Sequence, residues 1–260
     1  MDVAGDGSDR DEYARRARYL PGMLVLAPIG IVVAAAGWQD ARIVTVITGV
    51  AVTVGMPFVL ESFVRQQGLA FEVTELPGSE GRWVTTQMMW PLGKTPEETA
   101  RNADNRRVVE AVIGRPLPAE VPPDQGAAVG AALDGAIAEI RSITRDASTY
   151  PILKSENAEY GMWRNLRGVR AFGRSAAVLA AIAALVLIAA SASDRLASST
   201  AELVVGLFAV VAIGAFWWFV PTDRRVRQAA QRYALALFDA ARLLARDPRT
   251  SAVDMRAEGS

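Results

Sequence analysis

The sequence predicts a mainly α-helical membrane protein. We expect four transmembrane helices, arranged as two hairpins on either side of a cytosolic α+β segment, followed by a C-terminal amphipathic helix. Hydrophobic residues make up 51% of the 260 residues, and the mean hydropathy is +0.18. These apolar residues gather in long runs with arginines at their flanks, whereas a soluble chain spreads them in short periodic stretches.

Four apolar runs are long enough to cross a bilayer. They cover residues 20–38, 43–64, 175–192 and 203–220. A helix needs about 20 mostly apolar residues to span the hydrocarbon core, where a backbone group without a hydrogen-bond partner costs several kcal/mol. Glu61 and Glu202 lie near run ends, where a carboxylate can reach the interface. The short connectors at residues 39–42 and 193–202 predict two antiparallel hairpins.

Arginines predict the orientation of these runs. The flanks outside the hairpins hold Arg10, Arg15, Arg16, Arg18, Arg65, Arg164, Arg167, Arg170, Arg174, Arg224, Arg225 and Arg227. The hairpin tips hold only Arg42 and Arg195, each offset by an aspartate. By the positive-inside rule, both termini and the middle segment face the cytosol. The alternative for the first run is a signal peptide cleaved after residues 34–36, but a second apolar run follows it directly.

Residue usage indicates a bacterial source. Arginine, alanine and valine are abundant, and the only lysines are Lys94 and Lys154, which is typical of a GC-rich genome. We therefore expect a multi-pass protein of the bacterial cytoplasmic membrane.

Small residues and prolines inside the runs bear on helix packing. Ala176, Ala180 and Ala184 recur every four residues, which gives a smooth face for close approach of another helix, within the chain or between chains. Pro28 and Pro57 each remove a backbone N–H, so each frees a carbonyl that a neighbouring group must satisfy.

The cytosolic middle is predicted to combine a β-hairpin with helices. Residues 71–76 and 84–90 alternate in polarity around a Pro/Gly turn at residues 77–81, which is typical of a hairpin. Thr95 and Glu98 form a capping box that begins a helix, and Gly114 ends it after Ile113. After a proline-rich linker at residues 115–124, a second helix is expected over residues 127–147. Its apolar stripe consists of Val129, Leu133, Ile137, Ile140 and Ile143.

Two clusters near the last two runs are candidate sites. Arg164, Arg167, Arg170 and Arg174 precede the third run and are candidate contacts for anionic lipid headgroups or a small anionic ligand; the simpler interpretation is that they only fix topology. After the fourth run, a heptad-like seam includes Val226, Tyr233, Leu237 and Leu244. These residues are a candidate oligomer seam, with folding back onto the cytosolic helices as the alternative.

The predicted organisation therefore has six parts. They are a cytosolic leader at residues 1–19, a first transmembrane hairpin at 20–64, the cytosolic α+β segment at 65–174, a second hairpin at 175–220, a cytosolic amphipathic helix at 221–246 and a disordered tail at 247–260.

Composition argues against most enzyme chemistry. Cysteine and histidine are absent, and the sequence contains no phosphate-binding loop, dinucleotide fingerprint, zinc-protease motif or nucleophile elbow. We therefore expect no enzyme and no catalytic, cofactor-binding or metal-ligating residues. With 28 basic and 28 acidic residues, no global charge favours nucleic acid as a partner.

The predicted function is that of a cytosolic sensing or interaction module coupled to a four-helix membrane bundle. The bundle would work as a homo-oligomer, and such an oligomer could be a channel or a membrane-perturbing effector. The alternative is a passive membrane scaffold that recruits a cytosolic protein partner. The runs carry few polar residues, which argues against a wet pore. A hydrophobic pore that gates by dewetting, or a pore lined by Thr45, Thr48 and Thr53, is the alternative form of the channel.

Overall fold

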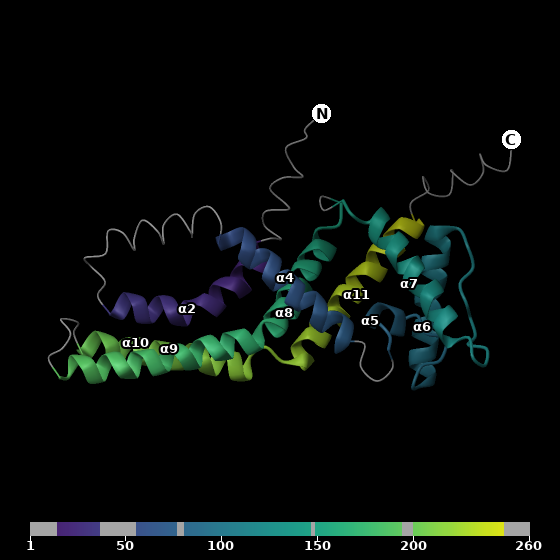
Figure 1. Ribbon diagram of the computed structural model, residues 1–260. Coiled ribbons are helices and arrows are strands. Elements are labelled where there is room, and N and C mark those ends of the chain that lie inside the picture. Colours follow the sequence, from purple (N-terminus) through teal and green to yellow (C-terminus); the bar gives the residue numbers. More distant parts are fainter. Residues whose placement is uncertain (1–14, 37–55, 77–80, 147–148, 194–199, 247–260) are drawn as a thin grey trace, which may run out of the picture. The chain divides into compact units, whose positions relative to one another are not determined.

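The computed structural model describes residues 15–36, 56–76, 81–146, 149–193 and 200–246, and 81% of them are helical (Figure 1). The elements are the π-helical turn η1 (Arg15–Tyr19), α2 (Leu20–Ala35), α4 (Met56–Thr74), α5 (Val84–Gln87), α6 (Pro96–Ile113), α7 (Gly126–Ile143), α8 (Pro151–Gly168), α9 (Arg170–Ser191), α10 (Thr200–Phe219) and α11 (Asp223–Arg246). They divide into two compact units. Unit 1 takes in Met1–Val73 and Gly161–Val226, and unit 2 takes in Thr74–Tyr160 and Arg227–Ser260.

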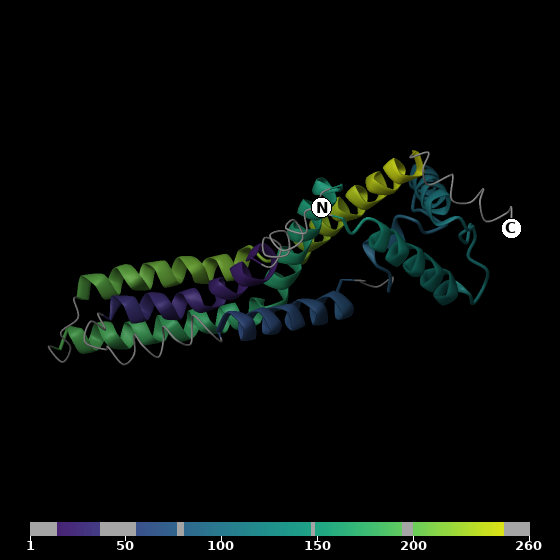
Figure 2. The same cartoon turned by 90° about the horizontal axis from the view of Figure 1, so that it is seen from above.

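Three apolar helices form the centre of unit 1. Helices α2, α9 and α10 lie side by side in both views of the molecule (Figures 1 and 2). A Cβ at Gly206, near the start of α10, would lie 2.9 Å from the Cβ of Ala35 at the end of α2. Trp217, near the end of α10, donates a hydrogen bond to the carbonyl oxygen of Leu24, near the start of α2. Helix α2 is therefore antiparallel to α10.

Close contact between α2, α9 and α10 depends on small side chains. Ala180 and Ala184 of α9 are buried in a cluster with Val32 of α2 and Val210 of α10. Ala176 is buried as well. The predicted smooth face of the third run therefore packs within the chain, as expected for helices that associate without a strong hydrophobic driving force.

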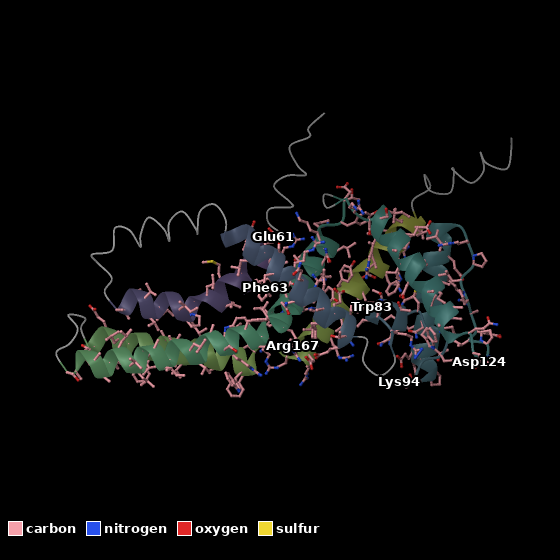
Figure 3. All side chains as sticks on the ribbon, viewed as in Figure 1. Glu61, Phe63, Trp83, Lys94, Asp124 and Arg167 are labelled. Atoms are coloured by element: carbon pink, nitrogen blue, oxygen red, sulfur yellow. The ribbon has the colours of Figure 1, made fainter. Side chains whose placement is uncertain are left out.

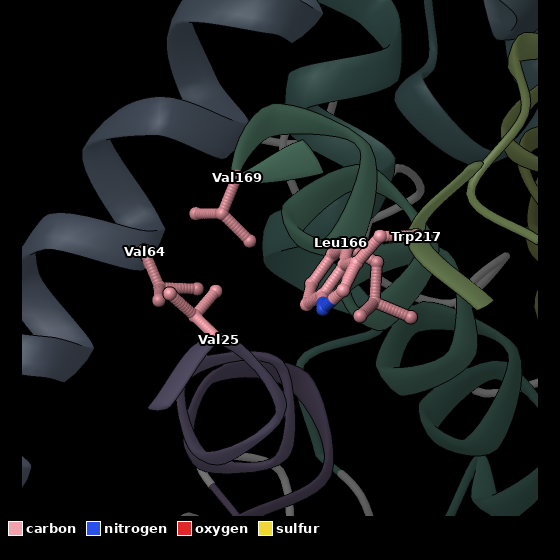
Figure 4. Close-up of a cluster of buried hydrophobic side chains, with 5 residues drawn as sticks. All are labelled: Val25, Val64, Leu166, Val169 and Trp217. Carbon is pink, nitrogen blue, oxygen red and sulfur yellow. The ribbon is translucent and has the colours of Figure 1, made fainter. Parts of the chain in front are cut away.

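A second cluster joins this bundle to α4 and α8. Val25, Val64, Leu166, Val169 and Trp217 are buried together (Figure 4). Trp217 is the largest of them and is fully buried. Because these residues come from α2, α4, α8, α10 and the junction before α9, the cluster fixes the arginine-bearing ends of the helices relative to one another.

The expectation of four transmembrane helices is wrong. Three helical stretches of the described chain are long and apolar enough to cross a membrane, namely Ala17–Ala35, Arg170–Ser191 and Thr200–Phe219. They correspond to the first, third and fourth predicted runs. Of the second run, residues 43–55 lie outside the described residues, and the remainder belongs to α4, which carries Glu61, Arg65 and Glu72 and continues to Thr74. These charges make α4 too polar to qualify.

The predicted β-hairpin is absent, and the described residues contain no strand. Its first strand is the last part of α4. The buried positions there are Val64, Gly68 and Phe71, which are spaced by four and three residues, as on one face of a helix. Val73, which the alternating pattern placed on the same face as Phe71, is 67% exposed. The alternating stretch covers only a few residues. It therefore hid the helical spacing of buried positions that begins at residue 64.

The second predicted strand is the short helix α5 and the turn that follows it. Val84, Thr85 and Thr86 are buried in succession, so the segment does not alternate between a buried and an exposed face. The backbone carbonyls of residues 87–90 accept hydrogen bonds from side chains of α6 and not from a neighbouring strand.

Helices α6 and α7 lie where the sequence predicts helices, but α7 ends at Ile143 and not at residue 147. Thr95 caps α6 through a hydrogen bond from the Glu98 amide, and Gly114 ends the helix with a φ of 70°. Glu98 reaches back to the amide of Lys94, one residue before the capping box requires. Helix α7 buries the predicted stripe as far as Ile140, whereas Ile143 at its end is 44% exposed.

Candidate functional site

The outer faces of the bundle in unit 1 are apolar. Leu179 and Val186 on α9 are 65% and 62% exposed, and Phe208 on α10 is 72% exposed. Side chains along α9 and α10 are drawn almost entirely as carbon, whereas nitrogen and oxygen gather toward α4 and α8 (Figure 3). Water does not favour a continuous exposed surface of large aliphatic and aromatic groups, and lipid does.

Two ion pairs lie at the end of the bundle where α2 begins. Arg18 pairs with Glu61 of α4, and Arg164 of α8 pairs with Glu72 at 2.5 Å. Between them, the amide of fully buried Asn165 donates to the carbonyl oxygen of Ala17 at 2.6 Å. Arginine and carboxylate thus connect α4 to η1 and to α8.

Arg167 has a separate set of partners. Its Nε donates to Asp223 at 2.5 Å, and its guanidinium lies 4.9 Å from the ring centroid of Phe71. Asp223 is the first residue of α11, so the pair connects α8 to the turn that follows α10. Arg167 is labelled in Figure 3.

Arg170 and Arg174 cap the end of α10. The Nε atoms of both side chains donate to the carbonyl oxygen of Trp217, at 3.2 and 3.3 Å. Their Nη2 atoms donate to the carbonyl oxygen of Trp218, at 2.6 and 3.4 Å. The last carbonyls of a helix have no intrahelical donor and carry partial negative charge, so cations are favourable there. The four predicted arginines therefore separate into two that bind carboxylates and two that bind a helix terminus.

The seam of α11 is covered by the chain itself. Val226 and Leu237 are fully buried, and Tyr233 is 8% exposed. The Tyr233 ring stacks on Tyr160 of α8, with a centroid distance of 5.9 Å and an interplanar angle of 11°. Leu244 is half-buried. These seam side chains are buried within the chain, and their role as an oligomer seam stays a prediction.

A polar cluster of α6 was not predicted from the sequence. Asn102 donates to the carbonyl oxygens of Gln87 and Trp90 at 3.2 and 3.0 Å. Asn105 donates to Met88 at 2.9 Å, and Arg106 to Met89 at 2.7 Å. Burial lowers the pKa of the Arg106 guanidinium from its ordinary value, while the charge of Glu110 opposes that shift. The sequence did contain a signal for this cluster. Asn102, Asn105 and Arg106 are spaced so that they lie on the same side of the helix as Val109, which is buried.

Within the described residues, the polar side chains of these clusters bind backbone carbonyls, carboxylates and aromatic rings of the same chain. The described residues hold no group of histidine, cysteine, aspartate and glutamate that could bind a metal ion. Glu98, which is adjacent to Glu97 in the sequence, accepts a hydrogen bond from the Lys94 amide just before α6. Three described helices are compatible with a multi-pass membrane protein. Comparison of the chain with protein-family profiles, with curated proteins and with solved structures finds no match.

Proposed function

We propose that this chain is a non-enzymatic integral membrane protein that holds a helical interaction or sensing module at the cytosolic face of the bacterial cytoplasmic membrane. The observation that carries this proposal is the outward-facing apolar surface of α2, α9 and α10, which ends at a cluster of arginines. Unit 1 is then the membrane part, and the helices of unit 2 form the module.

The direction of the helices supports an orientation that places the start of α2, the start of α9 and the end of α10 together on the cytosolic side. Asn165, just before α9, bonds to Ala17 at the start of α2, and Trp217 at the end of α10 bonds to Leu24. The arginines lie at this same end, and positive charge near the ends of spans favours the cytosolic side.

The native absence of cysteine makes this orientation simple to test. Ser193→Cys, at the exposed end of α9, should react with a membrane-impermeant maleimide added to intact cells. Arg101→Cys, on the exposed side of α6, should react only after the cells are broken. The reverse pattern would contradict the proposed orientation. Extraction of the chain from membranes by alkaline carbonate would contradict membrane insertion itself.

Coupling between module and bundle is supported by two helices. Residues of α8 and of α11 belong to both units, so a partner that binds unit 2 can act on unit 1 through continuous backbone. We propose a second copy of the chain or a cytosolic protein as that partner. A passive scaffold, the second candidate, requires no such coupling.

Release of dye from liposomes separates a coupled channel from an anchor. The buried cluster shared by α2, α9 and α10 consists of alanine and valine side chains with isoleucine and leucine packed against them, whereas a wet pore normally has polar ones. We therefore expect purified protein to leave dye-loaded liposomes tight in the resting state. Dye release on chemical cross-linking of the chain into oligomers would identify a conducting bundle, and tight liposomes under every condition would identify an anchor.

A further inference from the structure

Two guanidinium groups of unit 1 converge on the same pair of carbonyl oxygens. Arg170 and Arg174 both donate to Trp217 and to Trp218, through Nε and Nη2 in each case. Sharing both acceptors brings two positive charges to within a few ångströms of each other. Such like charges repel unless a negative group lies close by.

The protein groups close to this pair do not balance its charge, because Asp223, which attracts Arg170, also binds Arg167. The terminus of a helix carries about half a negative charge, against two full positive charges here. Arg164 and Arg167, one to two turns earlier, differ because each binds a carboxylate, Glu72 and Asp223 respectively. Within the described part of the chain, no carboxylate forms an ion pair with Arg170 or Arg174.

Donors remain free for a further anion. A guanidinium has five N–H groups, and each of these two uses its Nε–H and one Nη2 donor on α10. Among the described residues, the Nη1 donors and the second hydrogen of each Nη2 have no further acceptor. Arginine donors in this planar arrangement suit the oxygens of a phosphate group, which can accept two parallel hydrogen bonds.

The surroundings of the pair indicate which phosphate would bind. The Arg174 guanidinium lies 4.8 Å from the ring centroid of Trp218, which is 45% exposed, and the next residue, Phe219, is 74% exposed. Aromatic side chains beside arginines are typical of the level of lipid headgroups. The apolar outer faces of α9 and α10 begin directly beyond this level and would contact acyl chains.

We propose that Arg170 and Arg174 bind the phosphate group of an anionic phospholipid at the membrane interface. The proposal rests on the membrane insertion argued above. An anionic lipid fits better than free phosphate because its acyl chains gain contact with the apolar surface next to the pair.

Native mass spectrometry of the delipidated full chain in detergent tests this site. Phosphatidylglycerol should bind more tightly than phosphatidylcholine. Replacing both residues, Arg170→Gln with Arg174→Gln, should weaken phosphatidylglycerol binding on the order of 30-fold and leave phosphatidylcholine unchanged. Arg101→Gln, which removes an exposed arginine from unit 2, is the matched control and should change neither affinity.

A change of less than about threefold in the double variant would overturn the site, as would equal binding of the two lipids by the native chain. If the double variant does not fold, Arg170→Lys with Arg174→Lys decides the question, because lysine keeps the charge but cannot donate in parallel. Because that variant keeps the charge, its preference for phosphatidylglycerol should fall by less than in the glutamine variant, and full retention would contradict the site. Displacement of the lipid by millimolar inorganic phosphate would assign the pair to free phosphate. Alkaline extraction of the same variants reports membrane insertion separately.

Discussion

The indole N–H of Trp217 donates to the carbonyl oxygen of Leu24 at 3.3 Å. In a regular helix this carbonyl would accept from the amide of residue 28, but that residue is Pro28, which has no N–H. Trp217 is fully buried, so the bond is formed where water does not compete. The side chain of α10 therefore replaces the hydrogen bond that the proline removes from α2.

We expect Trp217→Phe to destabilise unit 1 by about 1 kcal/mol through the lost hydrogen bond, in addition to the loss of buried ring area. In a Pro28→Ala background the backbone amide of the introduced alanine can donate to the Leu24 carbonyl. The same tryptophan substitution should then cost less, by about the energy of the hydrogen bond. A double-mutant cycle on the thermal unfolding of the detergent-solubilised chain measures this coupling.

The neighbouring tryptophan provides the control for this cycle. Trp218 is 45% exposed, and Trp218→Phe should change stability by less than about 0.5 kcal/mol in either background. Additive effects of the Trp217 and Pro28 substitutions would show that the two positions are not coupled through the Leu24 carbonyl.

Gly168 should not tolerate a side chain, because the backbones of α4 and α8 cross there. A Cβ at this position would lie 2.5 Å from the carbonyl carbon and oxygen of Gln67. Alanine normally favours a helix over glycine by up to about 1 kcal/mol. At this crossing we expect the opposite, with Gly168→Ala lowering stability by about 1 to 3 kcal/mol through forced backbone separation.

Gly130 in α7 is the matched control for Gly168, because a Cβ there meets nothing within 4 Å. Gly130→Ala should stabilise the chain slightly. The melting temperatures of both variants, compared with the native chain, test the argument. Equal stabilisation by the two alanines would mean that α4 and α8 do not approach so closely.

The elements with unambiguous local signals could be predicted from the sequence. Thr95 and Gly114 mark the ends of α6 through capping chemistry that involves only nearby residues. Because proline has no N–H, the sequence also predicted that a carbonyl one turn before Pro28 would need another donor. That donor is Trp217, which lies 193 residues from Leu24, so no local pattern could identify it.

The segment after residue 64 was misread because two periods fit it. Phe71 and Val73 alternate with polar residues, yet Val64, Gly68 and Phe71 share one face of a helix. Which period holds depends on what Gly68 packs against, and that partner is Asn165 of α8. For the arginines, the sequence indicated the cluster but not the division between carboxylate and carbonyl partners, because Glu72 and Asp223 are remote in sequence.

Arg106 should be essential to the turn that follows α5. In the native chain, Arg106 donates to the carbonyl oxygen of Met89 at 2.7 Å. Methionine keeps much of the arginine volume but leaves this carbonyl without its donor. An unsatisfied buried acceptor costs about 1 to 3 kcal/mol. We expect Arg106→Met to lower stability by that amount and to speed hydrogen exchange in residues 84–90. Arg107→Met, at the exposed next position, should do neither. Equal effects of the two would show that the carbonyl finds another donor.

The cap of α6 predicts a pH effect at Glu97. Hydrogen bonds from its own backbone amide and then from the Thr95 hydroxyl lower the pKa of this carboxyl below its ordinary value of 4.5. A carboxyl whose pKa is lower in the folded state stabilises the fold above the unfolded pKa, and this contribution is lost as the pH falls through the folded pKa. Thr95→Ala should therefore raise the Glu97 pKa toward 4.5.

The same substitution also removes the acceptor of the Glu98 amide, at 3.2 Å, which should cost about 1 kcal/mol at neutral pH. Carbon-13 NMR titration of the Glu97 carboxyl measures the pKa, and hydrogen exchange of the Glu98 amide measures the loss of the cap. Thr95→Ser retains a hydroxyl and should preserve both values. If serine behaves as alanine does, the hydroxyl is not the group that controls Glu97, and the cap must act through the backbone alone.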